Sequence, residues 1–151
     1  MSKYVIVVPL DGSKLSEAVL PTAKAFARAR LGEFVLTRVV PSLSINETVP
    51  ADELEEITIR YKQDCQDYLD AIATSLRAED CVVTTLLASG DQTADLILEV
   101  VDIAHADLIA MSTHGRSGLP RLMLGSIADK IVHRSTVPVL LVRPETESDH
   151  E

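Results

Sequence analysis

Cysteine and long apolar runs are both scarce in this chain of 151 residues. The cysteines, Cys65 and Cys81, lie far apart and outside any Cys-x-x-Cys motif, so neither a disulfide framework nor a zinc site is indicated. The longest apolar runs, such as 5–8 and 137–142, span a few residues, whereas a membrane helix needs about 18 or more. Because no apolar leader segment stands at the N-terminus, we expect a cytoplasmic protein without a membrane partner.

Aromatic and basic residues are also few. The chain has no tryptophan, and phenylalanine and tyrosine make up 3% of it. Its 23 acidic side chains outnumber its 14 lysines and arginines, which gives a formal net charge of -9. This charge repels a phosphodiester backbone, and no aromatic residue lies in a basic stretch where it could stack on bases. We therefore expect no nucleic-acid partner.

The rest of the composition is typical of a folded protein. The sequence is 46% hydrophobic and 25% charged, with a mean hydropathy of +0.17, which excludes disorder for most of its length. A chain of this length fits one domain with a sizeable core. We expect that domain to cover 1–144 and a polar, acidic tail to cover 145–151.

Apolar patterning predicts strands that alternate with helices. Runs of β-branched and other apolar residues indicate strands at 4–9, 33–40, 81–88, 106–111 and 137–142. Helical periodicity indicates helices that begin at Ser13 or Ser16, near Asp52, at Asp91 or Thr93, and at Ser126. Because Pro21 falls inside the first of these helices, a bend or a displaced start is expected there.

This alternation predicts an α/β fold with a five-stranded parallel sheet and helices on both faces, in a flavodoxin-like or Rossmann-like order. Ligands of such sheets bind at the carboxyl ends of the strands, where the strand order reverses. We therefore expect the site to be built from residues 9–13, 39–41 and 111–126. Residues 41–51 contain two prolines and are expected to form a loop.

The segment between the fourth predicted strand and the last helix has the chemistry of a phosphate site. Gly115 and Gly118 allow main-chain amides to approach a bound group closely. Gly125 and Ser126 place amides and a hydroxyl at the positive end of a helix dipole. Arg116 and the nearby Arg121 add positive charge that suits an anionic ligand.

A second interpretation of this segment is a glycine-rich turn that binds nothing. In it, Ser126 caps the last helix and Asp129 completes a capping arrangement. The residues alone leave both interpretations open. No Gly-Lys-Ser or Gly-Lys-Thr and no Gly-x-Gly-x-x-Gly occurs, so P-loop and dinucleotide-binding proteins are disfavoured.

Two further side chains are candidates for ligand contacts. Asp11 follows the first strand and has the chemistry to accept hydrogen bonds from ribose hydroxyls, or merely to shape the turn before the first helix. His114 has the chemistry to contact phosphate or act as an acid or base, but a lone loop histidine is more often structural. No catalytic residue is assigned.

Three segments together form a family pattern: Val-Pro-Leu-Asp-Gly-Ser at 8–13, Met-Ser-Thr-His-Gly-Arg-Ser-Gly at 111–118, and Val-Pro-Val-Leu-Leu-Val-Arg at 137–143. They resemble the universal stress proteins of the UspA superfamily, over roughly residues 3–143. The subgroup that binds ATP has Gly-x-x-Gly, nine residues, then Gly-Ser or Gly-Thr. Gly115, the nine-residue interval and Gly125-Ser126 match this pattern, whereas Ser112 replaces its first glycine. The Ser112 side chain would crowd the nucleotide or donate a hydrogen bond to it.

The resemblance implies that ATP binds together with Mg²⁺. It places Pro9, Leu10 and Val39 around the adenine and Asp11 at the ribose. Around the phosphates it places Gly115, Arg116, Gly125, Ser126 and Ile127. The expected set of nucleotide-binding residues is completed by Met111, Ser112, His114 and Gly118. The metal ligands stay unknown, and at most slow ATP hydrolysis is expected.

The resemblance also implies a universal stress protein domain over 1–144 that acts as a nucleotide-dependent stress-response or regulatory module. Members of the family commonly form homodimers through their last strands, here Val139 to Val142. A nucleotide-free dimeric interaction protein of the same fold is the alternative, which Ser112 permits. An adenylating enzyme is disfavoured, because no Ser-Gly-Gly-x-Asp-Ser-like loop follows the first strand.

Overall fold

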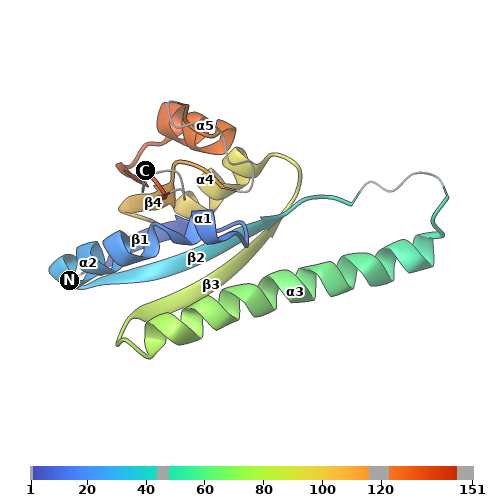
Figure 1. Cartoon of the computed structure of the whole chain (residues 1–151), viewed down its shortest axis with the longest axis horizontal. Helices are drawn as coiled ribbons and strands as arrows, with labels where there is room; N and C mark the ends of the chain where they lie inside the picture. The colour runs from blue at the N-terminus through green and yellow to red at the C-terminus, as the bar shows by residue number, and fades with distance from the viewer. Residues whose placement is uncertain (1, 44–47, 116–122, 146–151) are drawn as a thin grey trace.

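The computed structural model describes residues 2–43, 48–115 and 123–145, in which strands and helices alternate (Figure 1). Along the chain these are β1 (Tyr4–Pro9), α1 (Lys14–Glu17), α2 (Leu20–Arg30), β2 (Gly32–Val40), α3 (Ala51–Arg77), β3 (Val82–Ser89), α4 (Thr93–Ile103), β4 (Leu108–Ser112), α5 (Ser126–Arg134) and β5 (Val139–Val142). The predicted strands therefore exist, with ends that differ by one or two residues. Residues 146–151 of the expected tail lie outside the described residues.

The five strands form one parallel sheet in the order β3-β2-β1-β4-β5. This is the Rossmann-like of the two expected orders. The chain adds β2 and β3 on one side of β1 and then crosses to add β4 and β5 on the other. The order thus reverses between β1 and β4, so the crevice for a ligand opens at the carboxyl ends of these two strands.

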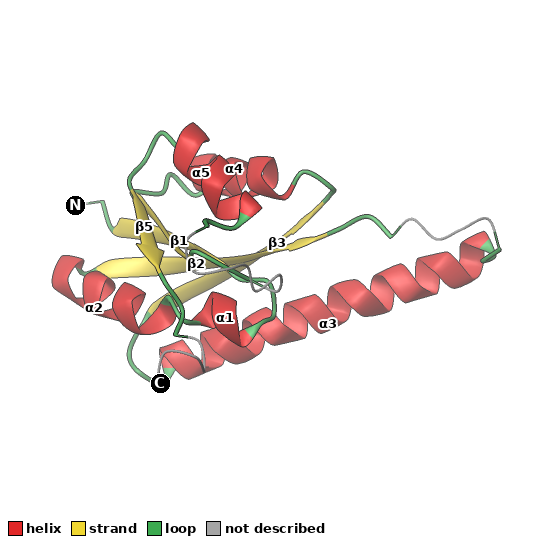
Figure 2. Cartoon of the chain, turned by 45° about the horizontal axis from the view of Figure 1, so that its top comes forward, coloured by secondary structure: helices red, strands yellow, loops and turns green. Residues whose placement is uncertain are grey.

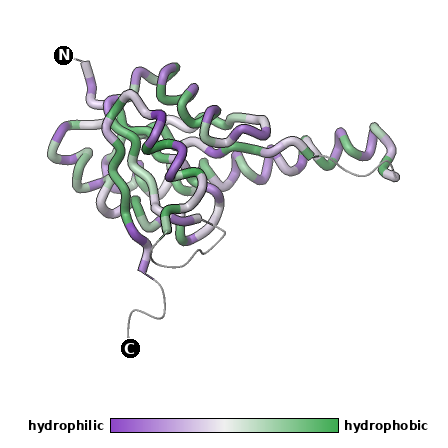
Figure 3. The backbone as a smooth tube through the Cα atoms, turned by 90° about the horizontal axis from the view of Figure 1, so that it is seen from above, coloured by the Kyte–Doolittle hydropathy of each residue, from purple (hydrophilic) through white to green (hydrophobic). Residues whose placement is uncertain are grey.

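Helices cover both faces of the sheet, as Figure 2 shows. Helices α1, α2 and α3 lie on one face, and α4 and α5 lie on the other. The side chains of β1 alternate between the two resulting cores: Ile6 and Val8 pack with residues of α2 and α3, whereas Val7 packs with residues of α4 and α5. All three are 0% exposed. Figure 3 shows hydrophobic residues concentrated in these central strands.

The first predicted helix is divided in two. Ser13 caps α1, because its hydroxyl oxygen accepts a hydrogen bond from the main-chain N–H of Ser16 at 3.2 Å. Helix α2 starts again at Leu20 with Pro21 in its first turn, where the missing N–H of proline is tolerated. The displaced start expected at Pro21 is confirmed.

Helix α3 is longer than the sheet that it covers. Its C-terminal half packs through Cys65, Leu69, Ala73 and Leu76, which are buried. Its N-terminal part extends beyond the sheet (Figure 1, Figure 3), so that Ile57 is 39% exposed. None of the helices in the described ranges is both long and apolar enough to cross a bilayer.

Candidate functional site

A cavity of about 340 Å³ opens where the strand order reverses. Its walls come from the carboxyl ends of β1, β2 and β4 and from the first turns of α4 and α5. This is the edge of the sheet at which parallel α/β folds bind ligands. The volume lies within the roughly 300–1,000 Å³ that is usual for ligand pockets.

Every predicted site residue that the structure describes lines this cavity. They are Pro9, Leu10, Asp11, Val39, Met111, Ser112, His114, Gly115, Gly125, Ser126 and Ile127. The two other predicted residues, Arg116 and Gly118, lie outside the described residues, as does Arg121. Segments far apart in sequence therefore meet at one site.

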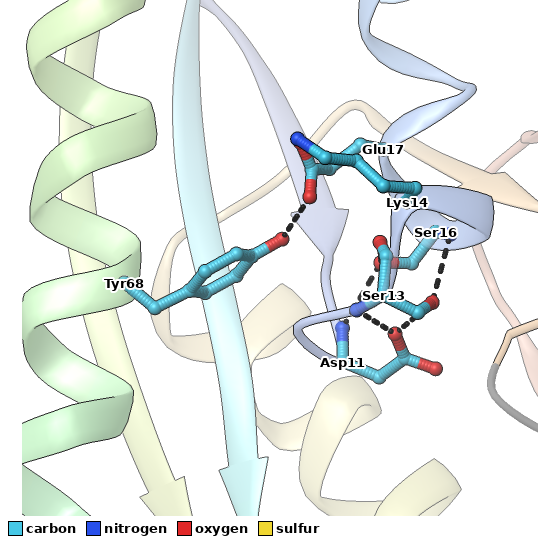
Figure 4. A network of polar contacts seen from close by, with 6 residues as sticks. All are labelled: Asp11, Ser13, Lys14, Ser16, Glu17 and Tyr68. Atoms are coloured by element: carbon cyan, nitrogen blue, oxygen red, sulfur yellow. Dashed lines mark hydrogen bonds and ion pairs between the residues drawn. The ribbon is translucent and has the colours of Figure 1, made fainter.

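The turn after β1 is organised by Asp11 (Figure 4). Its Oδ1 atom accepts hydrogen bonds from the main-chain N–H of Ser13 at 2.9 Å and from the Ser13 hydroxyl at 2.5 Å. Ser16 Oγ in turn accepts from the Asp11 N–H at 3.3 Å and donates to the Ser13 carbonyl at 2.8 Å. The turn-shaping role expected for Asp11 is therefore present, and the same carboxylate also lines the cavity.

The other oxygen of this carboxylate lies against the loop that follows β4. A Cβ atom added to Gly115 would clash with Asp11 Oδ2, so the glycine lets the carboxylate lie directly against the loop in this position. The turn after β1 and the loop after β4 therefore form one continuous surface at the mouth of the crevice.

Gly125 brings the start of α5 close to the segment that follows β4. Its N–H donates to the Thr113 carbonyl at 2.9 Å, and an added Cβ would be 2.9 Å from that same oxygen. Gly125 itself is the N-cap of α5, and no side chain among the described residues caps the helix. The expectation that Ser126 caps α5 is therefore wrong, because Ser126 is the first residue inside the helix and its hydroxyl is one position too late to cap it.

His114 is buried and holds the loop after β4 together. Its Nε2 atom is hydrogen-bonded to the main-chain oxygen of Met123, and its Nδ1 atom lies 2.8 Å from Thr113 Oγ1. Because a carbonyl oxygen only accepts, Nε2 carries the proton in the neutral ring and Nδ1 accepts from the Thr113 hydroxyl. Both ring nitrogens are thus engaged, which favours the structural role.

Sequence reasoning missed Arg38, a cation that also lines the cavity. Its guanidinium lies over the Tyr68 ring of α3, 5.1 Å from the ring centre, and the Tyr68 hydroxyl donates to Glu17 Oε2 at 3.0 Å. Burial, and then the hydrogen bond to Glu17, raise the pKa of Tyr68 above its usual range. The sequence signal that could have identified Arg38 was its position near the carboxyl end of the second predicted strand.

Two buried hydroxyl groups in the cavity wall have no hydrogen-bond partner among the described residues. They are Thr37 Oγ1 on β2 and Ser112 Oγ on β4. The Thr37 residue is 0% exposed and the Ser112 residue 6% exposed. Sequence reasoning singled out Ser112 and missed Thr37, which lies inside an apolar strand.

The described part of the chain holds no group of three or more histidine, cysteine, aspartate or glutamate side chains placed to bind a metal ion. Asp11 is the carboxylate that lines the cavity. A divalent cation there would therefore be held by one carboxylate and by oxygens of a bound ligand, which is the usual arrangement for Mg²⁺.

A model of the universal stress protein family matches residues 4–143. The chain belongs to the universal stress protein family. Universal stress protein MJ0531 from Methanocaldococcus jannaschii is 31% identical over 139 residues, which cover 91% of this chain and 81% of that protein. The resemblance inferred from the sequence motifs is thereby confirmed.

Solved structures of the family have the same fold. The structure of MJ0577 from M. jannaschii superimposes with a TM-score of 0.83 at 22% identity, covering 97% of this chain and 100% of that one. A family member from Arabidopsis thaliana with AMP bound has a TM-score of 0.65 at 15% identity and covers 96% of this chain and 94% of its own. One from Archaeoglobus fulgidus in complex with dAMP has a TM-score of 0.62 at 19% identity, with coverages of 93% and 97%. These likenesses establish the α/β fold of this universal stress protein.

Proposed function

We propose that this universal stress protein binds an adenine nucleotide in the cavity, with ATP and Mg²⁺ as the physiological ligand. The observation that carries the proposal is the meeting of three kinds of wall in one cavity of about 340 Å³. These are an apolar wall, the carboxylate of Asp11 and the N-terminus of α5 at Gly125. These three surfaces suit the base, the sugar and the phosphates of a nucleotide, respectively.

Each wall suits one part of the ligand. Val39, Ile97 and Met111 offer an apolar surface to the flat faces of adenine. Asp11 accepts hydrogen bonds from ribose hydroxyls, which a carboxylate does strongly. The N–H groups at the start of α5, which no described side chain caps, are directed at phosphate oxygens and carry the positive end of the helix dipole.

The structures of family members with AMP and dAMP support the choice of an adenine nucleotide. For ATP, the loop after β4 supplies Arg116 in the sequence as a further phosphate ligand. Asp11 is the residue of the cavity wall that would hold Mg²⁺, which would neutralise part of the phosphate charge in a chain whose net charge is -9. Gly118 completes the proposed phosphate loop.

Binding rather than turnover is the proposed activity. Phosphoryl transfer needs a group that orients the attacking water. His114 is the histidine in the cavity wall, and both of its ring nitrogens are already hydrogen-bonded. We therefore propose a nucleotide-dependent stress-response or regulatory module in which hydrolysis is at most slow.

We further propose that the protein works in the cytoplasm as a homodimer paired through β5. This strand (Val139–Val142) is at one edge of the sheet and pairs with β4 on its other side. An apolar edge strand exposes main-chain N–H and C=O groups that a second copy can pair with. Pro138 and Pro144 limit the length of the pairing.

Isothermal titration with ATP, with and without Mg²⁺, and with AMP tests nucleotide binding. We expect saturable binding of one nucleotide per chain. Asp11→Asn is expected to weaken it about tenfold, because a hydrogen bond to a charged group is lost while the turn-forming Oδ1 acceptor stays. Asp102→Asn, which removes an exposed carboxylate from α4, is the matched control. Absence of saturable binding at millimolar ATP with Mg²⁺ would reject the proposal and favour the nucleotide-free interaction protein.

A further inference from the structure

The unpartnered hydroxyl of Thr37 is the least expected feature of the cavity. The Thr37 residue is 0% exposed, its Oγ1 has no hydrogen-bond partner among the described residues, and yet it lines the cavity. A buried hydroxyl without a partner destabilises the free protein, because it has lost its hydrogen bonds to water and gained none. Such groups are rare in native proteins and point to a ligand or an ordered water.

The position of Thr37 in β2 decides which part of the cavity its side chain borders. It lies between Val35 and Val39, both of which belong to the core on the α4 and α5 face. Side chains alternate along a strand, so Thr37 shares this face. Its neighbours across the sheet are Pro9 on β1 and Leu86 on β3, at the same level of the register.

The strand side chains around Thr37 on this face are apolar, whereas Thr93 and Ser126 line the cavity at the first turns of α4 and α5. Val39, Ile97 and Met111 line the same cavity and belong to the same core. An apolar strand surface with one buried, unpartnered hydroxyl fits a ligand group that is apolar on its faces and polar on its edge. A purine base has this chemistry, whereas a phosphate or a sugar needs several polar partners.

The other unpartnered hydroxyl, that of Ser112, is on the opposite face. It follows Leu108 and Ala110 at two-residue intervals, and both of these pack in the core with residues of α2 and α3. The two hydroxyls therefore border different parts of the cavity, and Thr37 is the one on the apolar side.

We propose that Thr37 is a specificity-determining residue whose hydroxyl hydrogen-bonds the edge of the adenine base. The inference rests on the proposed function, because it assigns one contact within that site. The apolar wall alone accepts any flat ring of the right size. The hydroxyl adds a requirement for a hydrogen-bonding group at one place on the ring edge.

Thr37→Val tests the assignment, because valine keeps the shape of threonine and removes only the hydroxyl. Thr84→Val, on the exposed surface of β3, is the matched control. Affinities of both variants and of the wild type are measured by titration with AMP, with adenosine and with 2′,3′-dideoxyadenosine 5′-monophosphate. We expect Thr37→Val to weaken all three ligands by the same factor of about five to ten. Thr84→Val is expected to bind like the wild type.

The three ligands separate the possible contacts. If Thr37→Val loses affinity for AMP but not for adenosine, the hydroxyl contacts the phosphate. If the variant loses affinity for AMP and adenosine but not for the dideoxy ligand, the hydroxyl contacts the ribose. Either result overturns the assignment to the base. Unchanged affinity of Thr37→Val for every ligand overturns it as well, while leaving the proposed function intact. A wild type that binds none of the three overturns both.

Thermal unfolding without ligand gives a second readout. Removal of a buried, unpartnered hydroxyl is expected to raise the melting temperature of Thr37→Val by about 2–4 °C. A lowered melting temperature would mean that the hydroxyl has a partner within the free protein, and this too would overturn the assignment.

Discussion

Asp11 Oδ2 lies so close to Gly115 that a Cβ atom on residue 115 would clash with it. This contact joins the turn after β1 to the loop after β4, two segments about 100 residues apart in sequence. The same carboxylate fixes the turn through its Oδ1 atom and Ser13. Asp11 therefore shapes one wall of the cavity and closely approaches the other.

Gly115→Ala is expected to weaken nucleotide binding about tenfold, because the new methyl group must displace either the Asp11 carboxylate or the loop. The measurement is isothermal titration with ATP and Mg²⁺. The control is the same substitution in an Asp11→Ala background, where the clashing oxygen is absent. In the Asp11→Ala background, Gly115→Ala is expected to weaken nucleotide binding less than about twofold further. An equal loss of affinity in both backgrounds would show that the contact between Asp11 and residue 115 does not determine nucleotide binding.

Ser112→Ala is expected to stabilise the ligand-free protein by about 1 kcal/mol, since it removes a buried hydroxyl that has no partner among the described residues. Ser16→Ala is the matched comparison and is expected to lower the free energy of unfolding by about 1 kcal/mol. Ser16 Oγ has hydrogen bonds to the Asp11 N–H and to the Ser13 carbonyl. Urea unfolding measures both variants. Destabilisation by Ser112→Ala would reveal a partner for this hydroxyl in solution.

Tyr68 makes stability depend on alkaline pH. Its pKa in the folded protein is raised above its ordinary value of 10.0, chiefly by burial and then by the hydrogen bond to Glu17. Below pH 10 both the folded and the unfolded chain keep the phenol proton, so ionisation of Tyr68 does not lower the free energy of unfolding there. Above pH 10 the unfolded chain releases this proton first, and the free energy of unfolding falls.

Tyr68→Phe removes this dependence. Wild type is expected to lose more stability between pH 9 and pH 11 than the variant does, as measured by urea unfolding at both values. The tyrosinate absorbance provides a control: one of the three tyrosines should titrate only when the chain unfolds. Parallel losses of stability in the two proteins would contradict the raised pKa.

The proposed β5 dimer is tested at one main-chain N–H. The carbonyl groups of Pro138 and Val142 accept hydrogen bonds from β4 and the segment after it. Main-chain groups alternate in direction along a strand, so the N–H of Leu141 faces away from β4. Leu141→Pro is expected to abolish the dimer in light scattering, whereas Leu141→Ala, which loses the side chain but keeps this N–H, retains it. A dimer that survives the proline would place the interface elsewhere.

The strands were accessible to sequence reasoning because their patterns are local, whereas the order of the sheet was narrowed to two choices. Apolar runs of strand length identify β1 and β4, and alternation with helices restricts the topology to a few choices. Pro21 indicated the division between α1 and α2, because its missing N–H is tolerated only in the first turn of a helix. The projection of α3 beyond the sheet was not foreseen, because the apolar spacing around Ile57 continues past the point where the sheet ends.

The glycines and Asp11 could be placed at the cavity from the sequence because they follow predicted strands, whose carboxyl ends meet at one edge of a parallel sheet. The cap of α5 was missed, since Gly125 and Ser126 differ by one position and sequence alone does not fix where a helix begins. Thr37 and Arg38 were missed for a different reason. Which side chains of β2 border the cavity depends on its register with β1 and on the packing of α3 and α4, and both are tertiary properties.

A crystal structure of the protein with ATP and Mg²⁺ shows whether the cavity binds a nucleotide and in which orientation. We expect the adenine on the apolar wall at Val39 and Ile97, and phosphate oxygens within hydrogen-bonding distance of main-chain N–H groups at the start of α5. An empty cavity at saturating nucleotide, or a nucleotide bound elsewhere on the chain, would contradict it.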